Sequence, residues 1–267
     1  MPTTENDGTG IYWRQEGAGE LLLLVQGLGV TSEMWYRVVP RLAIRYRVIV
    51  FDNRGVGGSD APAGPYAIAT MAADAAAVLD AAGVEAAHVF GLSMGGMIAQ
   101  ELVLQRPERV RSLILGCTGC GGRQAVPAAP EVIGVLMAQP TMAPEEGLSA
   151  MARYLYDPAT PRDRIEEDLA VCLRTLPTAS SYVAQLQGVI AYRSYSRLGT
   201  IKAPTLIIHG EHDQLVPPEN GKVLADAIPG ARLVMLADAG HVFITDQTDA
   251  ACEAILSFLE EVSSPGG

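Results

Sequence analysis

Short apolar runs bounded by turn residues recur along the chain and predict the strands of a sheet. The later runs are almost continuous stretches of Val, Ile and Leu, which is typical of parallel strands covered on both faces. We expect the strand at Ile11–Gln15 to lie at a sheet edge. The full set of predicted strands is Ile11–Gln15, Leu21–Gln26, Arg47–Asp52, Ala87–Leu92, Ser112–Cys117, Pro204–His209 and Arg232–Leu236.

Segments with a helical period lie between these runs. One apolar face is followed by Gly83, a natural helix stop, and consists of Met71, Ala75, Val78, Leu79 and Ala82. Further helices are predicted from Ser93 to Pro107 and over Lys222–Ile228 and Ala250–Val262. Alternating strands and helices favour an α/β fold with a mostly parallel central sheet covered by helices on both faces.

The alternation breaks over residues 121–200, where prolines separate helical pieces, and the sheet pattern resumes at Ile201. We therefore predict a core domain made of residues 1–120 and 201–267. Residues 121–200 would form a helical cap inserted between two strands. Such caps commonly cover an active site and shape its substrate pocket.

Composition and charge disfavour some classes of binding partner and some cellular locations. The 267 residues carry a net charge of −11 and no basic cluster, which disfavours nucleic acid and anionic membranes as partners. The N-terminus lacks the pattern of a secretory signal, and the longest apolar run, Leu21–Val25, is too short to span a bilayer. We expect a cytoplasmic protein, with a homodimer as one possible assembly.

The four cysteines do not point to a metal site. Cys117 and Cys120 have the spacing of half a zinc site or a redox pair, but no second ligand pair follows at a suitable distance. Free thiols in a reducing compartment are the simpler interpretation. We expect neither a metal nor a cofactor.

The segment Gly91-Leu92-Ser93-Met94-Gly95 carries the strongest chemical signal. It reads G-x-S-x-G between a predicted strand and a predicted helix. A serine on such a sharp turn presents its hydroxyl at the top of the sheet, where it can attack a carbonyl carbon. The two glycines allow the close approach of the neighbouring backbone. Ser93 is therefore the candidate nucleophile.

A serine nucleophile needs a base, and four histidines allow a choice by position. His88 begins a strand, which puts it at the wrong end of the sheet, and His209 lies within a strand. His241 follows the last strand, at the edge where ligands bind in open α/β sheets, and is the preferred base. His212, in a loop after another strand, is the rival candidate.

The acid that orients the base is expected in a loop after a strand. Asp213 fits best, Glu211 is close enough to be confused with it, and Asp238 is too near His241 in sequence. The chain order serine, aspartate, histidine also occurs in a known triad family. For the oxyanion we expect two backbone N–H donors, those of Leu28 in a glycine-flanked loop and of Met94 at a helix N-terminus.

Taken together, these motifs resemble the α/β-hydrolase superfamily from about Leu21 to Leu259. The resemblance rests on Gln26–Gly29, Phe51–Ser59, the turn at Ser93, Gly210–Asp213 and Gly240-His241. It implies the α/β-hydrolase fold, and it is nearest to capped esterases and lactonases such as 3-oxoadipate enol-lactonases and acyl-homoserine lactonases. Many relatives have histidine where this chain has Gln26. Because the expected donor is backbone, catalysis should survive this change.

The function expected from these residues is hydrolysis of a carboxylic ester or lactone with a medium-length apolar acyl part. No lysine occurs between residues 121 and 200, which disfavours a strongly anionic substrate unless one of Arg123, Arg153, Arg193 and Arg197 points inward. The predicted substrate contacts are Trp35, Met137, Met142, Tyr154, Leu215, Val216 and Val242, with Leu28, Met94, Leu155 and Phe243 beside them.

Three alternatives remain open at this point. The same triad could hydrolyse a carbon–carbon bond or form peracids, and a non-catalytic receptor could use the pocket for binding alone. Aspartate at position 93 would indicate a dehalogenase, but the residue is serine. Fold alone does not choose among them.

Overall fold

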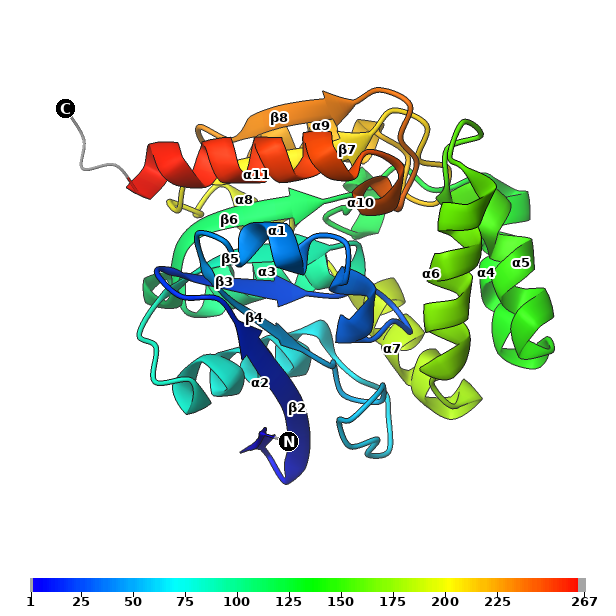
Figure 1. Cartoon of the computed structure of the whole chain (residues 1–267), viewed down its shortest axis with the longest axis horizontal. Coiled ribbons are helices and arrows are strands. Elements are labelled where there is room, and N and C mark those ends of the chain that lie inside the picture. Colours follow the sequence, from blue (N-terminus) through cyan, green and yellow to red (C-terminus); the bar gives the residue numbers. More distant parts are fainter. Residues whose placement is uncertain (1, 264–267) are drawn as a thin grey trace.

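The computed structural model describes residues 2–263, which form one eight-stranded sheet with helices on both faces (Figure 1). The strand order is β1-β2-β4-β3-β5-β6-β7-β8. The β1–β2 and β2–β4 pairs are antiparallel, and the remaining pairs are parallel. The strands are β1 (Thr3–Asn6), β2 (Thr9–Glu16), β3 (Leu21–Val25), β4 (Arg47–Phe51), β5 (Ala87–Leu92), β6 (Val110–Gly116), β7 (Thr205–Gly210) and β8 (Arg232–Leu236).

The mostly parallel sheet is confirmed, but the prediction that Ile11–Gln15 forms its edge is wrong. The edge is β1, which pairs with β2 from Thr3 opposite Tyr12 to Asn6 opposite Thr9. β1 has the sequence TTEN and alternates between exposed and half-buried positions. A polar strand of four residues has no apolar period, so the hydrophobic pattern could not predict it.

The central strands are apolar at every position because each face of the sheet has its own core. In β3, Leu21, Leu23 and Val25 belong to one hydrophobic cluster, while Leu22 and Leu24 belong to the other. Successive side chains of a strand point to opposite faces, so a strand covered on both sides needs an unbroken apolar run.

The helices divide between these two cores. The first cluster includes residues of α2, α3 and α9, and the second includes residues of α1 and α11. The helices are α1 (Val39–Leu42), α2 (Ile68–Ala81), α3 (Met94–Gln105), α4 (Pro130–Ala138), α5 (Pro144–Leu155), α6 (Arg162–Arg174), α7 (Ala179–Ala191), α8 (Tyr195–Leu198), α9 (Glu219–Ala227), α10 (Phe243–Asp246) and α11 (Thr248–Ser263).

Five of these helices, α4 to α8, lie in the chain between β6 and β7. Figure 1 shows α4, α5 and α6 grouped beyond the carboxyl ends of the strands, the edge toward which the arrows of β3 and β6 point. The short α8 instead contacts α3 and α9, which pack against the sheet. The boundaries of the cap at residues 121 and 200 stay a prediction.

No helix within residues 2–263 is both long enough and apolar enough to cross a lipid bilayer.

Candidate active site

Ser93 lies at the junction of β5 and α3 in an unusual backbone conformation. Its φ is 56° and its ψ is −120°, a backbone conformation that residues other than glycine rarely adopt. The turn is fixed by a hydrogen bond of 2.8 Å from Ser93 N to Gly116 O on the neighbouring strand. A non-glycine residue in such a conformation costs on the order of 1–3 kcal/mol, and residues of this kind cluster at functional sites.

The glycines around Ser93 are there because the backbone passes too close for a side chain. A Cβ at Gly91 would lie 2.2 Å from Gly95 O, and a Cβ at Gly95 would lie 2.0 Å from Val25 O. Both distances are far below van der Waals contact. The G-x-S-x-G pattern therefore reports tight packing of β5 against the start of α3.

The candidate base and acid are in contact. His241, in the loop between β8 and α10, has its Nδ1 2.8 Å from Asp213 Oδ2. The other carboxylate oxygen, Asp213 Oδ1, accepts hydrogen bonds of 2.9 and 2.8 Å from the backbone amides of Leu215 and Val216. The carboxylate is thus held from one side by its own loop while its free oxygen orients the imidazole.

The charge state of Asp213 follows from its neighbours. Burial raises the pKa of this carboxyl, but the adjacent His241 and His209 rings lower it, and the net pKa lies well below the ordinary value. His209 contributes through its Nε2, which is 3.3 Å from Asp213 Oδ2. Asp213 is therefore a carboxylate at neutral pH and can stabilise an imidazolium at His241.

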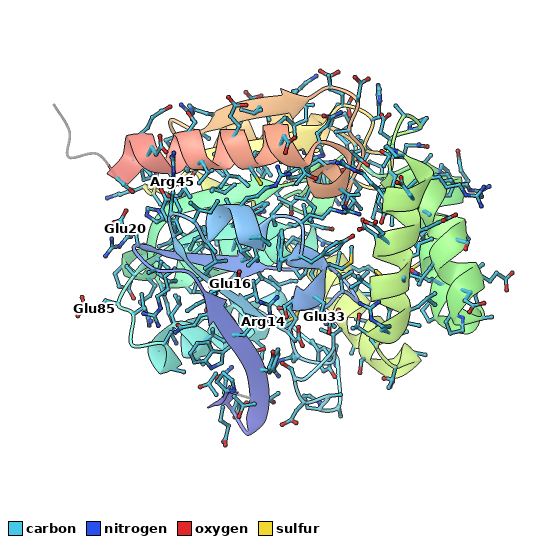
Figure 2. The ribbon with its side chains drawn as sticks, viewed as in Figure 1. Arg14, Glu16, Glu20, Glu33, Arg45 and Glu85 are labelled. Carbon is cyan, nitrogen blue, oxygen red and sulfur yellow. The ribbon has the colours of Figure 1, made fainter. Side chains whose placement is uncertain are left out.

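His88 and His212 lie elsewhere. His88 Nδ1 is 2.8 Å from Ser112 Oγ, and its Nε2 is 3.7 Å from Glu20 Oε2. Figure 2 shows Glu20 at the end of the sheet opposite α4–α6, so His88 belongs to that far end. His212, the rival base, is paired with Asp157, and it does not line the cavity that contains Ser93.

The loop after β3 passes directly over the nucleophile. A Cβ at Gly27 would be 3.3 Å from Ser93 Cβ, so this loop approaches as closely as a glycine permits. Leu28 lines the same cavity as Ser93. Met94 opens α3, so its N–H is among the helix amides that have no acceptor within the helix. Met94 therefore follows Ser93 directly in the chain, and Leu28 follows the glycine that approaches Ser93 most closely in this loop.

Two glutamines and an asparagine hold this loop in place. Gln26 Oε1 accepts from Gly27 N over 2.8 Å, and Asn53 Nδ2 donates to Gln26 O over 2.9 Å. From α7, Gln185 Oε1 accepts from Gly29 N over 2.8 Å. The glutamine that replaces the histidine of many relatives is thus part of the loop's support.

Ser93 and His241 line one cavity of about 300 Å³ between the strand ends and the helices of the predicted cap. Within the described residues, no hydrogen bond joins Ser93 Oγ to the imidazole. Such contacts are often long in unliganded enzymes and shorten when substrate binds. The rest of the wall is almost entirely apolar, and none of its described residues is Asp, Glu, Lys or Arg.

The cavity wall contains some of the predicted substrate contacts and not others. Leu28, Met142, Leu155, Leu215 and Val242 are part of it.

Trp35, Met137, Tyr154 and Val216 are not part of the wall, and their assignment as substrate contacts stays a prediction. Trp35 is fully buried in the core, with its ring centroid 5.2 Å from that of Phe90. The backbone of Val216 is hydrogen-bonded at both groups: its N–H donates to Asp213 Oδ1, and its carbonyl oxygen pairs with His209 Nε2.

Met137 and Tyr154 lie outside the wall for a common reason. In each helix the neighbouring residue lines the cavity instead: Leu136 in α4 and Leu155 in α5. Met137 is 51% exposed, and Arg153 covers the ring of Tyr154 with its guanidinium 4.7 Å from the ring centroid. A helix turns by about 100° per residue, so an assignment that is one position off selects a different face.

Several wall residues were absent from the sequence prediction. Leu148 and Met151 lie on α5 at helical spacing from the predicted Leu155, and this pattern could have identified them. Gln139 and Tyr182 carried no such signal, because their proximity depends on how the helices pack. The wall also includes Met34, Leu169, Cys172, Leu176 and Ile244.

One cluster in the described chain has donor atoms close enough to hold a metal ion: Cys117, His209 and Asp213, whose ligand atoms lie within 4.8 Å of one another. These atoms already have protein partners. Cys117 Sγ is 3.5 Å from Gly210 N, His209 Nε2 is 2.8 Å from Val216 O, and Asp213 accepts from His241. The arrangement supports the loops of the site without a metal.

The comparison with known proteins agrees with this geometry. A model of the alpha/beta hydrolase fold family matches residues 20–133 and 175–247. The chain belongs to this family. The match leaves out residues 134–174, which include most of α4 to α6.

Three similar proteins illustrate the range within the family. The "Putative carbamate hydrolase RutD" of Azorhizobium caulinodans is 34% identical, with 98% of this chain and 99% of the relative covered. Est816, described as an N-acyl homoserine lactone degrading enzyme, is 30% identical, with a TM-score of 0.83 over 96% of this chain and 100% of the other. The enol-lactonase of Burkholderia xenovorans LB400 is 29% identical, with a TM-score of 0.82 over 97% and 100%.

Proposed function

We propose that this α/β hydrolase cleaves carboxylic esters or lactones through a Ser93–His241–Asp213 triad and an acyl-enzyme intermediate. The observation that carries the proposal is that Ser93, on its strained turn, shares one cavity with His241, whose Nδ1 is held by an ionised Asp213. A serine hydroxyl is a weak nucleophile, and this arrangement supplies the base and the oriented tautomer that it needs.

In the proposed reaction, Ser93 Oγ attacks the substrate carbonyl while His241 Nε2 takes the hydroxyl proton. The N–H groups of Leu28 and Met94 hold the oxyanion of the tetrahedral intermediate. His241 then returns the proton to the leaving oxygen, and the acyl group stays on Ser93. A water molecule, deprotonated by His241, releases the acid by the same steps in reverse order.

The cavity favours neutral, apolar acyl groups. Its wall combines aliphatic side chains with no formal charge except that which His241 gains during turnover. The four arginines considered from the sequence are all absent from the wall, and Arg197 pairs with Glu101 at 2.7 Å. A dicarboxylate or a carbamate anion would lose its hydration without gaining a counter-charge. We therefore infer a medium-length acyl ester or lactone, acted on in the cytoplasm.

The direct test is hydrolysis of p-nitrophenyl butyrate by the wild-type protein and by Ser93→Ala. We expect turnover that is abolished in the variant, and labelling of Ser93 by a fluorophosphonate probe. Undiminished activity in Ser93→Ala would refute the assignment. Failure of the probe to label the wild type would instead favour a receptor that binds ligands without cleaving them.

Two alternative reactions of the same triad can be distinguished by the substrates that the protein turns over. A carbon–carbon bond hydrolase would turn over a meta-cleavage diketone faster than simple esters, and a perhydrolase would form peracetic acid from acetate and peroxide. Because the wall offers no charged partner for a carboxylate substrate, we expect the simple esters and lactones to be preferred.

A further inference from the structure

The polar side chains of the cavity wall are few, and most of them are already satisfied. Tyr156 OH donates to Asp168 Oδ2 over 3.1 Å, and Tyr182 OH donates to Gln139 Oε1 over 2.8 Å. Gln139 belongs to a 3₁₀ turn (Gln139–Thr141) between α4 and α5, while Tyr182 belongs to α7. The contact between Gln139 and Tyr182 therefore joins two separate segments across the wall.

This contact uses the oxygen of the Gln139 amide. Its oxygen is the acceptor for Tyr182, so its Nε2 carries the two available N–H donors. Within the described residues, Nε2 has no hydrogen-bond partner. Gln139 is half-buried, so water can reach this NH₂ group, and a ligand that supplies an acceptor would take the place of that water.

The free donor belongs to a different segment of the wall from Ser93. Tyr182 lies against the loop over the nucleophile, since a Cβ at Gly29 would be 2.8 Å from the tyrosine ring. Gln139 contacts the hydroxyl of that ring and lies in the turn between α4 and α5. A group bound there belongs to the part of the substrate beyond the scissile carbonyl.

We propose that Gln139 is a specificity-determining residue whose Nε2 binds a second, uncharged carbonyl oxygen in the apolar part of the substrate. The inference rests on the proposed esterase or lactonase function and names its substrate class: an ester or lactone with a further keto, ester or amide carbonyl. A neutral acceptor is required because Gln139 offers donors without charge and the wall offers no cation.

The test uses p-nitrophenyl heptanoate and its 4-oxo, 5-oxo and 6-oxo analogues. For the wild type we expect at least one oxo ester to have a higher kcat/KM than heptanoate. In Gln139→Leu, the ratio of kcat/KM for that oxo ester to kcat/KM for heptanoate should fall about tenfold, the value of one hydrogen bond. Turnover of heptanoate by the variant shows that the site is folded.

Tyr182→Phe provides a second variant. It removes the hydroxyl that holds the amide oxygen, so the amide can rotate, and we expect a smaller selective loss on the same oxo ester. An equal loss on oxo and plain esters in Gln139→Leu, or no preference for any oxo ester in the wild type, overturns the inference. Failure of the wild type to hydrolyse plain heptanoate would count against the proposed function instead.

Discussion

Asp246 Oδ2 accepts a hydrogen bond of 2.7 Å from Gly240 N, the residue that precedes His241. The other carboxylate oxygen accepts from Thr160 Oγ1 over 2.6 Å. Gly240 itself leaves no room for a side chain, because a Cβ there would lie 2.7 Å from Leu155 O. The loop of the candidate base is therefore anchored both to α10 and to the segment after α5, and the position of His241 depends on both.

The buried carboxyl of Asp246 predicts that the free energy of unfolding depends on pH in an unusual way. Burial raises the pKa of Asp246 to about 6, although the hydrogen bonds from Thr160 and Gly240 lower it. The unfolded chain releases this proton near pH 4, so between about pH 4 and pH 6 the folded state binds more protons. The stabilisation of the folded state by this proton is present in full below pH 4 and is lost as the pH rises through 6. It amounts to on the order of 2–3 kcal/mol.

The variant Asp246→Asn isolates this effect. Its amide oxygen can accept from Gly240 N while its NH₂ donates to Thr160 Oγ1, but it cannot ionise. We expect its Tm, relative to wild type, to increase as the pH rises from 4.5 to 7. The nearby pair formed by Asp157 and His212 is present in both proteins. A difference in Tm that does not change with pH would contradict the prediction.

A second prediction concerns the carboxylate beside His241. In Asp213→Asn, the amide oxygen can still accept from Leu215 N and Val216 N, which leaves the NH₂ facing His241 Nδ1. Nδ1 must then accept, which puts the proton on Nε2, where it cannot take the proton of Ser93. We expect kcat for p-nitrophenyl butyrate to fall by about 10⁴ with little change in Tm. A loss smaller than tenfold would show that Asp213 does not orient the base.

The sequence alone located the framework of the site because each part has a local signature. The apolar run Leu21–Val25 indicates a strand covered on both faces, and the glycines around Ser93 mark positions where an added Cβ would lie about 2 Å from neighbouring backbone. His241 and Asp213 follow strands whose carboxyl ends meet at one edge of the sheet, so their positions in the chain already placed them near each other.

The substrate cavity was less predictable, because its wall depends on how helices pack. Leu155 lines the cavity and its neighbour Tyr154 does not, so a shift of one residue changes the assignment. The pair of Gln139 and Tyr182 is 43 residues apart in the chain and has no signature in either segment. Packing angles of the helices over residues 121–200 decide such contacts, and periodicity does not determine those angles.

The wall formed by α5 leads to a third prediction, on acyl-chain length. Met151 is buried on the same helical face as Leu148 and Leu155. The larger indole of Met151→Trp should occupy space for the end of an acyl chain. We expect kcat/KM for p-nitrophenyl octanoate to fall at least about tenfold, with acetate changed less than twofold. Met137→Trp is the control, since Met137 is exposed on α4, and it should leave the length profile unchanged.

Two helix glycines should respond to alanine with opposite signs. At Gly95 a Cβ would lie 2.0 Å from Val25 O and 2.8 Å from Gln26 O, both backbone atoms that cannot move without separating α3 from β3. We expect Gly95→Ala to lose more than about 4 kcal/mol or to fail to fold. At Gly134, inside α4, a Cβ would meet nothing within 4 Å.

Gly134→Ala should therefore gain the ordinary helix preference of alanine, about 0.5–1 kcal/mol, and raise Tm by about 1–4 °C. Thermal unfolding followed by circular dichroism measures both variants under the same conditions. A lower Tm in Gly134→Ala, or a folded Gly95→Ala with unchanged Tm, would mean that the two helices do not pack as described. Because α4 also supplies Leu136 to the cavity wall, unchanged ester hydrolysis in Gly134→Ala would show that stiffening this helix does not impede substrate entry.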